Sequence, residues 1–296
     1  MRIGELAALG AALCWTINGM FLESAGRRMG LGPVNFIRLI FGIIFLSIYM
    51  YISRGRLLPT DANMNAWLYL SISGIIGFFI GDYFLIKSML TIGPRMSMLM
   101  MSLSPPMAAL IDFIIFRTVL TGIQIIGMII TLLGVSIVVM GRKKPEDKAL
   151  EVDIKSGVIY GALGALGQAG GLIFSKLGMG TYNPFAATQI RIIAAIVVFL
   201  VIMVATNDYT KITEGIRHAR ELWKVVMAGL TGPFVGVGLS LLALQYTEAG
   251  VASTLSSVMP VTILPFSVII YKEKIGLIEI LGTILSVVGI AILFIL

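Results

Sequence analysis

The two halves of this chain are copies of one another, and this internal duplication limits the folds that the chain can adopt. Residues 117–127 align with residues 272–282, which begin 155 positions later. The pairs related by this offset include Pro105 with Pro260, Gly77 with Gly232, Gly81 with Gly236 and Gly134 with Gly289, and a similar offset of 153 relates Gly4 to Gly157, Ala12 to Ala165 and Arg38 to Arg191. The fold must therefore contain two similar units.

Both units consist mainly of apolar runs of about 20 residues, the length that a helix needs to cross roughly 30 Å of hydrocarbon. The chain is 58% apolar and 12% charged, with a mean hydropathy of +0.99, whereas soluble chains are about 45–50% apolar and about 25% charged. We therefore predict an all-α integral membrane protein with ten transmembrane helices. The expected helices cover residues 3–23, 33–53, 66–88, 94–116, 121–140, 155–177, 184–206, 222–244, 250–271 and 276–296.

Each half has an odd number of expected helices, so the two halves must enter the membrane from opposite sides. Two such halves form an inverted repeat, related by a pseudo-twofold axis in the membrane plane. We predict a first repeat over residues 1–140, a polar linker over 141–155 and a second repeat over 156–296. This is the usual plan of secondary transporters, which bind substrate where the halves meet and work by alternating access.

Several other function classes lack the residues that they require. Cys14 is the single cysteine and His218 the single histidine, so the sequence has no cluster of zinc ligands. The net charge of +7 is explained by short loops beside a membrane, and no basic face for nucleic acid is evident. The sequence has neither a Gly-rich phosphate loop nor the paired aspartates of lipid-substrate transferases. We expect no metal, no cofactor and no enzymatic activity.

The distribution of basic residues gives a first indication of the orientation in the membrane. Lysine and arginine are concentrated in the connections after the odd-numbered helices, which by the positive-inside tendency places both termini outside. The first helix has only Arg2 before it and no small-residue cleavage site, so we interpret it as a retained helix and not as a signal peptide.

One long stretch in each half carries a recognisable family pattern. Residues 244–260, followed by Tyr271-Lys-Glu-Lys and by residues 280–289, resemble the EamA repeat of the drug/metabolite transporter superfamily. The first half resembles it through Ser102-Leu-Ser-Pro-Pro and residues 126–134. The resemblance implies ten helices, a central cavity, transport of small metabolites and cytoplasmic termini. The acid that usually follows the fourth helix is present as Glu273 in the second copy, but Thr118 takes its place in the first.

A few polar residues lie well inside the expected helices, where they usually face a cavity or a partner because burying them in hydrocarbon is costly. The candidates for a central substrate site are Trp15, Asn18, Asp82, Tyr83 and Gln168. Asp82 has two interpretations: an internal ion pair with Lys87 or another cation, or a protonatable carboxylate that couples proton entry to transport. Both remain open at this stage.

The matched arginines, Arg38 and Arg191, also have two interpretations. Either side chain could extend to the lipid headgroups, or it could bind a substrate carboxylate in a bidentate manner. Pro105 and Pro260 are expected to kink the fourth and ninth helices and to border a gated cavity, because proline interrupts helical hydrogen bonding. The many glycines of the sixth helix indicate close helix packing.

These observations favour a secondary active transporter, by family habit an exporter, of small organic metabolites such as amino acids. Its expected partners are the solute, the lipid bilayer and protons, and the plasma membrane of a prokaryote is the expected location. The oligomeric state is open. Cationic drug efflux is the main alternative, although Glu5 and Glu23 lie only at the ends of the first helix. An integral-membrane enzyme and a pore or scaffold are less favoured.

Overall fold

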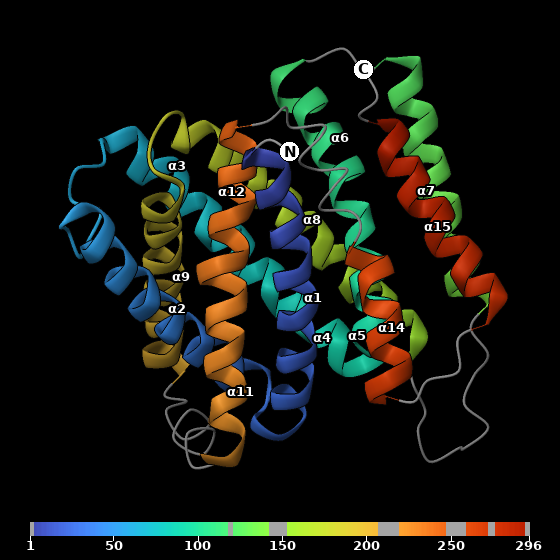
Figure 1. The fold of residues 1–296 in the computed structure, drawn as a ribbon, viewed down its shortest axis with the longest axis horizontal. Helices are drawn as coiled ribbons and strands as arrows, with labels where there is room; N and C mark the ends of the chain where they lie inside the picture. The colour runs from blue at the N-terminus through green and yellow to red at the C-terminus, as the bar shows by residue number, and fades with distance from the viewer. Residues whose placement is uncertain are drawn as a thin grey trace.

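The computed structural model of the chain describes residues 3–117, 121–141, 153–206, 219–246, 259–271 and 276–293. All regular structure within these ranges is helical. Most of the polar linker and most of the connection between residues 207 and 221 fall outside the described residues. The helices run roughly side by side, and several helices that are far apart along the chain, such as α7 (Gly122–Gly141) and α15 (Leu277–Leu293), are in contact (Figure 1).

The first repeat begins with two long helices and continues with two helices that change type along their length. Its elements are α1 (Ile3–Met29), α2 (Leu31–Arg54), α3 (Met64–Gly74), the π-helix η1 (Ile75–Gly81), α4 (Asp82–Ile92), α5 (Pro94–Met100), the 3-10 turn η2 (Met101–Leu103), α6 (Ser104–Phe116) and α7 (Gly122–Gly141). The turn η2 ends at Leu103, and Pro105 is the second residue of α6.

The second repeat follows the same plan. Its elements are α8 (Ile154–Met179), α9 (Pro184–Thr206), α11 (Ala219–Gly229), the π-helix η3 (Leu230–Gly236), α12 (Val237–Tyr246), α14 (Met259–Tyr271) and α15 (Leu277–Leu293). Pro260 is the second residue of α14, and Pro265 lies inside that helix.

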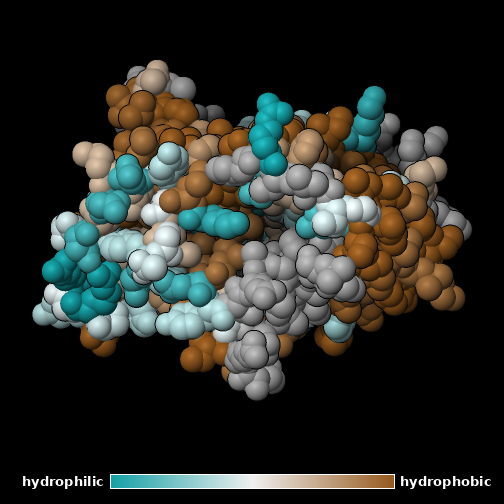
Figure 2. All heavy atoms as spheres, turned by 90° about the horizontal axis from the view of Figure 1, so that it is seen from above, coloured by the Kyte–Doolittle hydropathy of each residue, from teal (hydrophilic) through white to brown (hydrophobic). Residues whose placement is uncertain are grey.

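Eight helices in the described part of the chain are long and apolar enough to cross a membrane, and Leu277–Ile292 forms a shorter apolar helix. The multi-pass membrane architecture is therefore confirmed, whereas the count of ten crossings stays a prediction. Large apolar side chains such as Ile52, Ile269 and Met140 are mostly exposed, as a lipid-facing surface requires. At one end of the molecule, hydrophilic residues gather over part of the face while hydrophobic residues cover the flank (Figure 2).

Two sharp turns depend on glycine. Gly30 between α1 and α2 has φ of 84°, and Gly93 between α4 and α5 has φ of 85°. Residues with a Cβ rarely adopt this left-handed region. Gly93 is followed by Pro94, whose missing N–H is tolerated in the first turn of a helix. These residues determine where the helices end and the chain reverses.

The two π-helices occupy equivalent positions in the repeats. Residues 75–81 and 230–236 are each 7 residues long and are related by the offset of 155. Pro233 lies inside η3 and lacks a backbone N–H, whereas η1 contains no proline. π-helical turns are rare in proteins, and those that occur are often found at functional sites. Their duplication marks the middle of the third and eighth crossings as a special region.

Glycines permit the closest contacts between the repeats. A Cβ atom added at Gly167 of α8 would lie 3.0 Å from the backbone nitrogen of Gly81, and one at Gly171 would lie 3.1 Å from the Cα of Gly77. α8 therefore packs directly on η1. Helices α7 and α15 pack in a similar way, since a Cβ at Gly134 would lie 2.6 Å from the carbonyl oxygen of Gly282; they stand together at one side of the molecule (Figure 1).

Candidate functional site

Asp82 is the centre of a buried polar cluster between the repeats. It begins α4 immediately after the π-helix η1 and is fully buried. Its Oδ2 atom forms an ion pair with Nη2 of Arg38, which extends from α2. Its Oδ1 atom accepts a hydrogen bond of 2.8 Å from Nε2 of Gln168 in α8. One carboxylate thus joins a helix of its own repeat to a helix of the other.

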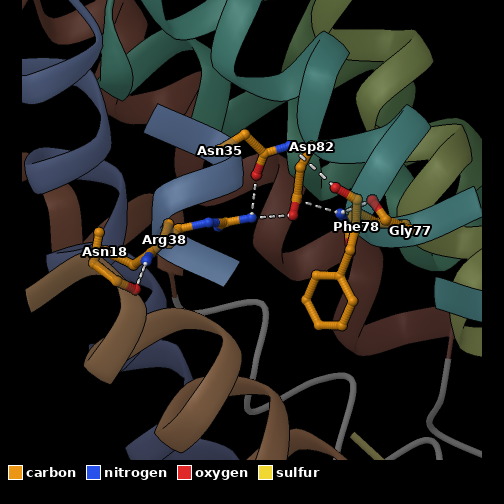
Figure 3. Close-up of polar contacts among 8 residues, drawn as sticks. Asn18, Asn35, Arg38, Gly77, Phe78 and Asp82 are labelled. Carbon is orange, nitrogen blue, oxygen red and sulfur yellow. Dashed lines mark hydrogen bonds and ion pairs between the residues drawn. The ribbon is translucent and has the colours of Figure 1, made fainter. Parts of the chain in front are cut away.

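Asn35 holds Arg38 in place. Its Oδ1 atom accepts a hydrogen bond of 2.7 Å from Nη2 of Arg38, and its Nδ2 atom donates one of 3.1 Å to the carbonyl oxygen of Phe78. Figure 3 shows the guanidinium of Arg38 directed at both Asn35 and Asp82. Asn35 was not among the predicted residues. Its position in an apolar run, three residues before Arg38, was a usable signal, because side chains at this spacing are neighbours on a helix.

The π-helix supplies backbone acceptors to this cluster. Nε2 of Gln168 donates a second hydrogen bond, of 3.2 Å, to the carbonyl oxygen of Gly77, and Asn35 uses the carbonyl of Phe78. Both carbonyls belong to η1. A π-turn changes the hydrogen-bonding pattern of the backbone, and here side chains from α2 and α8 bind to it.

Arg191 of α9 approaches the same region from the second repeat. Its side chain is buried, and its guanidinium carbon lies 4.7 Å from the centre of the Phe78 ring. A Cβ added at Gly77 would lie 3.1 Å from the Nη2 atom of Arg191, so the guanidinium lies beside the π-helix that precedes Asp82. Among the described residues, its Nε atom has no hydrogen-bond partner, and neither do Nε and Nη1 of Arg38. The cluster therefore contains two arginines and one aspartate.

The two arginines are anchored in equivalent ways. A Cβ added at Gly229 of α11 would lie 2.9 Å from the carbonyl oxygen of Arg38, and one at Gly74 of α3 would lie 2.7 Å from the Cα of Arg191. Gly74 and Gly229 are themselves repeat partners at the offset of 155 and directly precede η1 and η3. The backbone of each arginine is thus packed against the glycine that precedes the π-helix of the opposite repeat: Arg38 against Gly229 before η3, and Arg191 against Gly74 before η1.

The side chains of three other predicted residues have partners other than Asp82. Nδ2 of Asn18 donates a hydrogen bond of 2.7 Å to the carbonyl oxygen of Ala228, and Nε1 of Trp15 donates one of 3.4 Å to Oγ of Ser240. These contacts attach α1 to α11 and α12. Tyr83 is 39% exposed and contacts the ring of Phe84. The structure brings together Arg38, Asp82, Gln168 and Arg191.

The structure separates the alternatives that the sequence left open for the charged residues. Asp82 forms its internal ion pair with another cation, Arg38, and not with Lys87, whose Nζ atom lies over the ring of Tyr160 at 4.2 Å from the centroid. The arginines do not extend to the headgroups either: Arg38 is fully buried and Arg191 is 5% exposed. Helical rotation directs both side chains toward the protein interior, where Asp82 and Phe78 offer interactions that the interface does not.

The comparisons with known proteins agree with this architecture. The model of the EamA-like transporter family matches residues 2–140 and 155–295, one match in each half. No curated protein matches the chain significantly. Among the 28 similar chains of solved structures, one described as "Crystal structure of protein" has a TM-score of 0.68 and 15% sequence identity, and the alignment covers 98% of this chain and 95% of that chain. At this identity the likeness concerns the fold alone.

Proposed function

Because the chain belongs to the EamA-like transporter family, we propose that it is a secondary active transporter that exports a small organic metabolite, such as an amino acid or a related solute. The family is one of membrane transporters, which favours transport over catalysis. The matched repeats supply the two related halves that alternating access requires. We place the protein in the plasma membrane of a prokaryote.

The observation that carries this proposal is the bridge between the repeats at Asp82. Its carboxylate binds Arg38 of the first repeat and Gln168 of the second. Buried ionisable groups in transmembrane segments are costly, and they commonly mark substrate or ion pathways. If the two halves move against each other, the hydrogen bond and ion pair of Asp82 form in one relative position of the repeats and break in another.

The two π-helices supply a physical basis for that movement. They lie in the middle of equivalent crossings, and glycines such as Gly77 and Gly167 give the backbones close contact without interlocking side chains. Small contact residues let helices slide or tilt against each other at low steric cost. We propose that η1 and η3 bend in alternation as the central site opens to either side, with Pro105 and Pro260 at the borders of the gates.

Coupling to protons is part of the proposal and rests on Asp82. No ATP-binding signature occurs in the sequence, so uphill transport has to use an ion gradient or exchange. Proton arrival at Asp82 would weaken its ion pair with Arg38 and release the bridge. The alternative of cationic drug efflux gains nothing from this cluster, because its arginines outnumber its single carboxylate.

The test is transport by the purified protein in liposomes. Solutes from several classes, namely amino acids, organic acids, sugars, nucleosides and cationic dyes, are offered under an imposed pH gradient and without one. We expect saturable transport of one class, stimulated by the gradient and lost in Asp82→Asn. Transport that ignores the gradient contradicts proton coupling, whereas no transport of any class by folded protein contradicts the transporter proposal.

A further inference from the structure

The buried charge in the middle of the protein is unbalanced. In the described part of the chain, Arg38 and Arg191 are both buried beside η1 and the start of α4, and Asp82 is the only carboxylate of this cluster. The other buried carboxylates, Glu23 and Glu221, pair with basic residues near the end of α1 and the start of α11. The central cluster therefore has an excess of one positive charge.

Some donors of these two guanidinium groups are unused. Nε and Nη1 of Arg38 and Nε of Arg191 are buried and make no hydrogen bond to any described residue. A buried donor without an acceptor loses its hydration and gains nothing in return. Arg191 has instead the face of the Phe78 ring, 4.7 Å away. Guanidinium groups present fixed pairs of N–H donors, which match the two oxygens of a carboxylate or phosphate.

We infer that the solute transported by this protein carries an anionic group, a carboxylate or a phosphate, which binds between Arg38 and Arg191. This inference rests on the proposed transport function and narrows its substrate class. In the structure described here, Asp82 occupies part of the cluster as an internal counter-ion. An incoming anion takes the unused donors, balances the excess charge and weakens the hold of Asp82 on Arg38, so that binding loosens the bridge between the repeats.

The equivalent positions of the arginines support this inference. Arg38 and Arg191 are repeat partners, whereas Asp82 is matched by the apolar Val237 at the offset of 155. Both halves thus carry the cation, whereas the aspartate is present in the first half alone. Two cations related by a pseudo-twofold axis can both face a ligand on that axis, and a symmetric anion such as a carboxylate accepts from both sides.

The experiment measures counterflow in proteoliposomes and thermal stabilisation of the purified protein with a defined panel. The panel contains alanine, lactate, succinate and glycerol 3-phosphate as anion carriers, with glucose and tetraphenylphosphonium as the neutral and cationic comparisons. We expect saturable counterflow and a raised unfolding temperature with at least one anion carrier only. Preference for lactate, alanine or succinate over glycerol 3-phosphate identifies a carboxylate, and the reverse order identifies a phosphate.

Matched variants locate the site. Arg191→Gln is expected to lower the apparent affinity for that anion about ten- to hundredfold, because hydrogen bonds to a charged group are lost, while Arg191→Lys retains part of it. The exposed arginine variant Arg56→Gln is expected to behave like the unmodified protein. If Arg191→Gln does not fold, the double variant Arg38→Gln/Asp82→Asn replaces it in the thermal-stabilisation measurement alone, because it removes one arginine of the proposed site without leaving Asp82 unpaired; its apparent affinity for the anion is expected to fall about tenfold or more.

The possible failures are distinguishable. Transport of glucose or tetraphenylphosphonium alone overturns the anion inference but leaves a transporter. Anion transport that is equal in Arg191→Gln, Arg191→Lys and the unmodified protein also overturns the inference, because the arginine then takes no part in binding. Absence of both transport and thermal stabilisation with the whole panel contradicts the proposed function itself, and the inference with it.

Discussion

Arg38 and Asp82 form a buried ion pair between α2 and α4, 44 residues apart in the chain, with both side chains withdrawn from the surface. Breaking a buried pair by removing one partner leaves an uncompensated charge, and this costs about 3–5 kcal/mol in proteins. Because Asp82 also accepts a hydrogen bond from Gln168, the pair couples the packing of one repeat to the position of the other.

The first prediction concerns this pair. Asp82→Asn and Arg38→Gln are each expected to destabilise the protein by about 3–5 kcal/mol, whereas the double variant is expected to lose less than the sum of the two. The measurement is a double-mutant cycle from chemical unfolding in detergent. Additive losses would show that the two side chains do not interact energetically.

The second prediction concerns Gln168. Gln168→Leu is expected to cost about 1–3 kcal/mol, because it removes the hydrogen bonds to Asp82 and Gly77 and leaves the buried carbonyl with one acceptor site unused. Gln168→Glu is expected to cost more, since it places a second carboxylate against Asp82. The measurement is the unfolding temperature of both variants. An equal temperature for the two would argue against contact with the Asp82 carboxylate.

The third prediction concerns the glycines that precede the π-helices. Gly74→Ala and Gly229→Ala are each expected to destabilise the protein by about 1–3 kcal/mol, because the added methyl group would collide with the backbone of Arg191 or Arg38. Gly32→Ala is the matched control, since no atom lies within 4 Å of its added Cβ, and alanine is the better helix former. If Gly32→Ala were as destabilising as Gly74→Ala, the close contact would not be the cause.

The fourth prediction concerns a polar link between the repeats outside the membrane-spanning segments. Asp61, in the connection after α2, binds Arg54 and accepts a hydrogen bond of 2.8 Å from the hydroxyl of Tyr182, in the connection after α8. Slight burial acts in the opposite direction, but the hydrogen bonds from Tyr182 and Arg54 hold the pKa of Asp61 below its ordinary value. Burial, and next the bond to Asp61, raise the pKa of Tyr182.

The sign of the pH dependence follows from these directions. A carboxylate with a depressed pKa in the folded protein stabilises the fold above its ordinary pKa of about 3.9. That contribution is lost only as the pH falls through the lower pKa of the folded state. We therefore expect the link to be constant between about pH 5 and 8. Asp61→Asn should lower the pKa of Tyr182 toward its usual value, which a spectroscopic titration against Tyr182→Phe measures. An unchanged titration would contradict the hydrogen bond.

Much of the candidate site was visible in the sequence as separate residues. Asp82, Gln168, Arg38 and Arg191 were all selected because polar groups inside apolar runs are costly. Their mutual arrangement was not predictable, and for Arg38 and Arg191 the sequence left contact with the headgroups and binding of a substrate carboxylate both open. Asn18 and Trp15 were selected by the same reasoning, but they attach α1 to α11 and α12. Polarity alone does not distinguish a residue of the central cluster from one that holds two helices together.

The sequence by itself determined the helical membrane class, the two repeats and the family, because hydrocarbon forces each crossing to satisfy its backbone internally and leaves a readable run of about 20 apolar residues. Only the tertiary structure decided which charges meet. That choice depends on the rotation and depth of each helix, and the π-helices η1 and η3 alter both within a crossing. The pairing of Asp82 with Arg38 instead of Lys87 is therefore a property of packing across the fold and not of spacing along the chain.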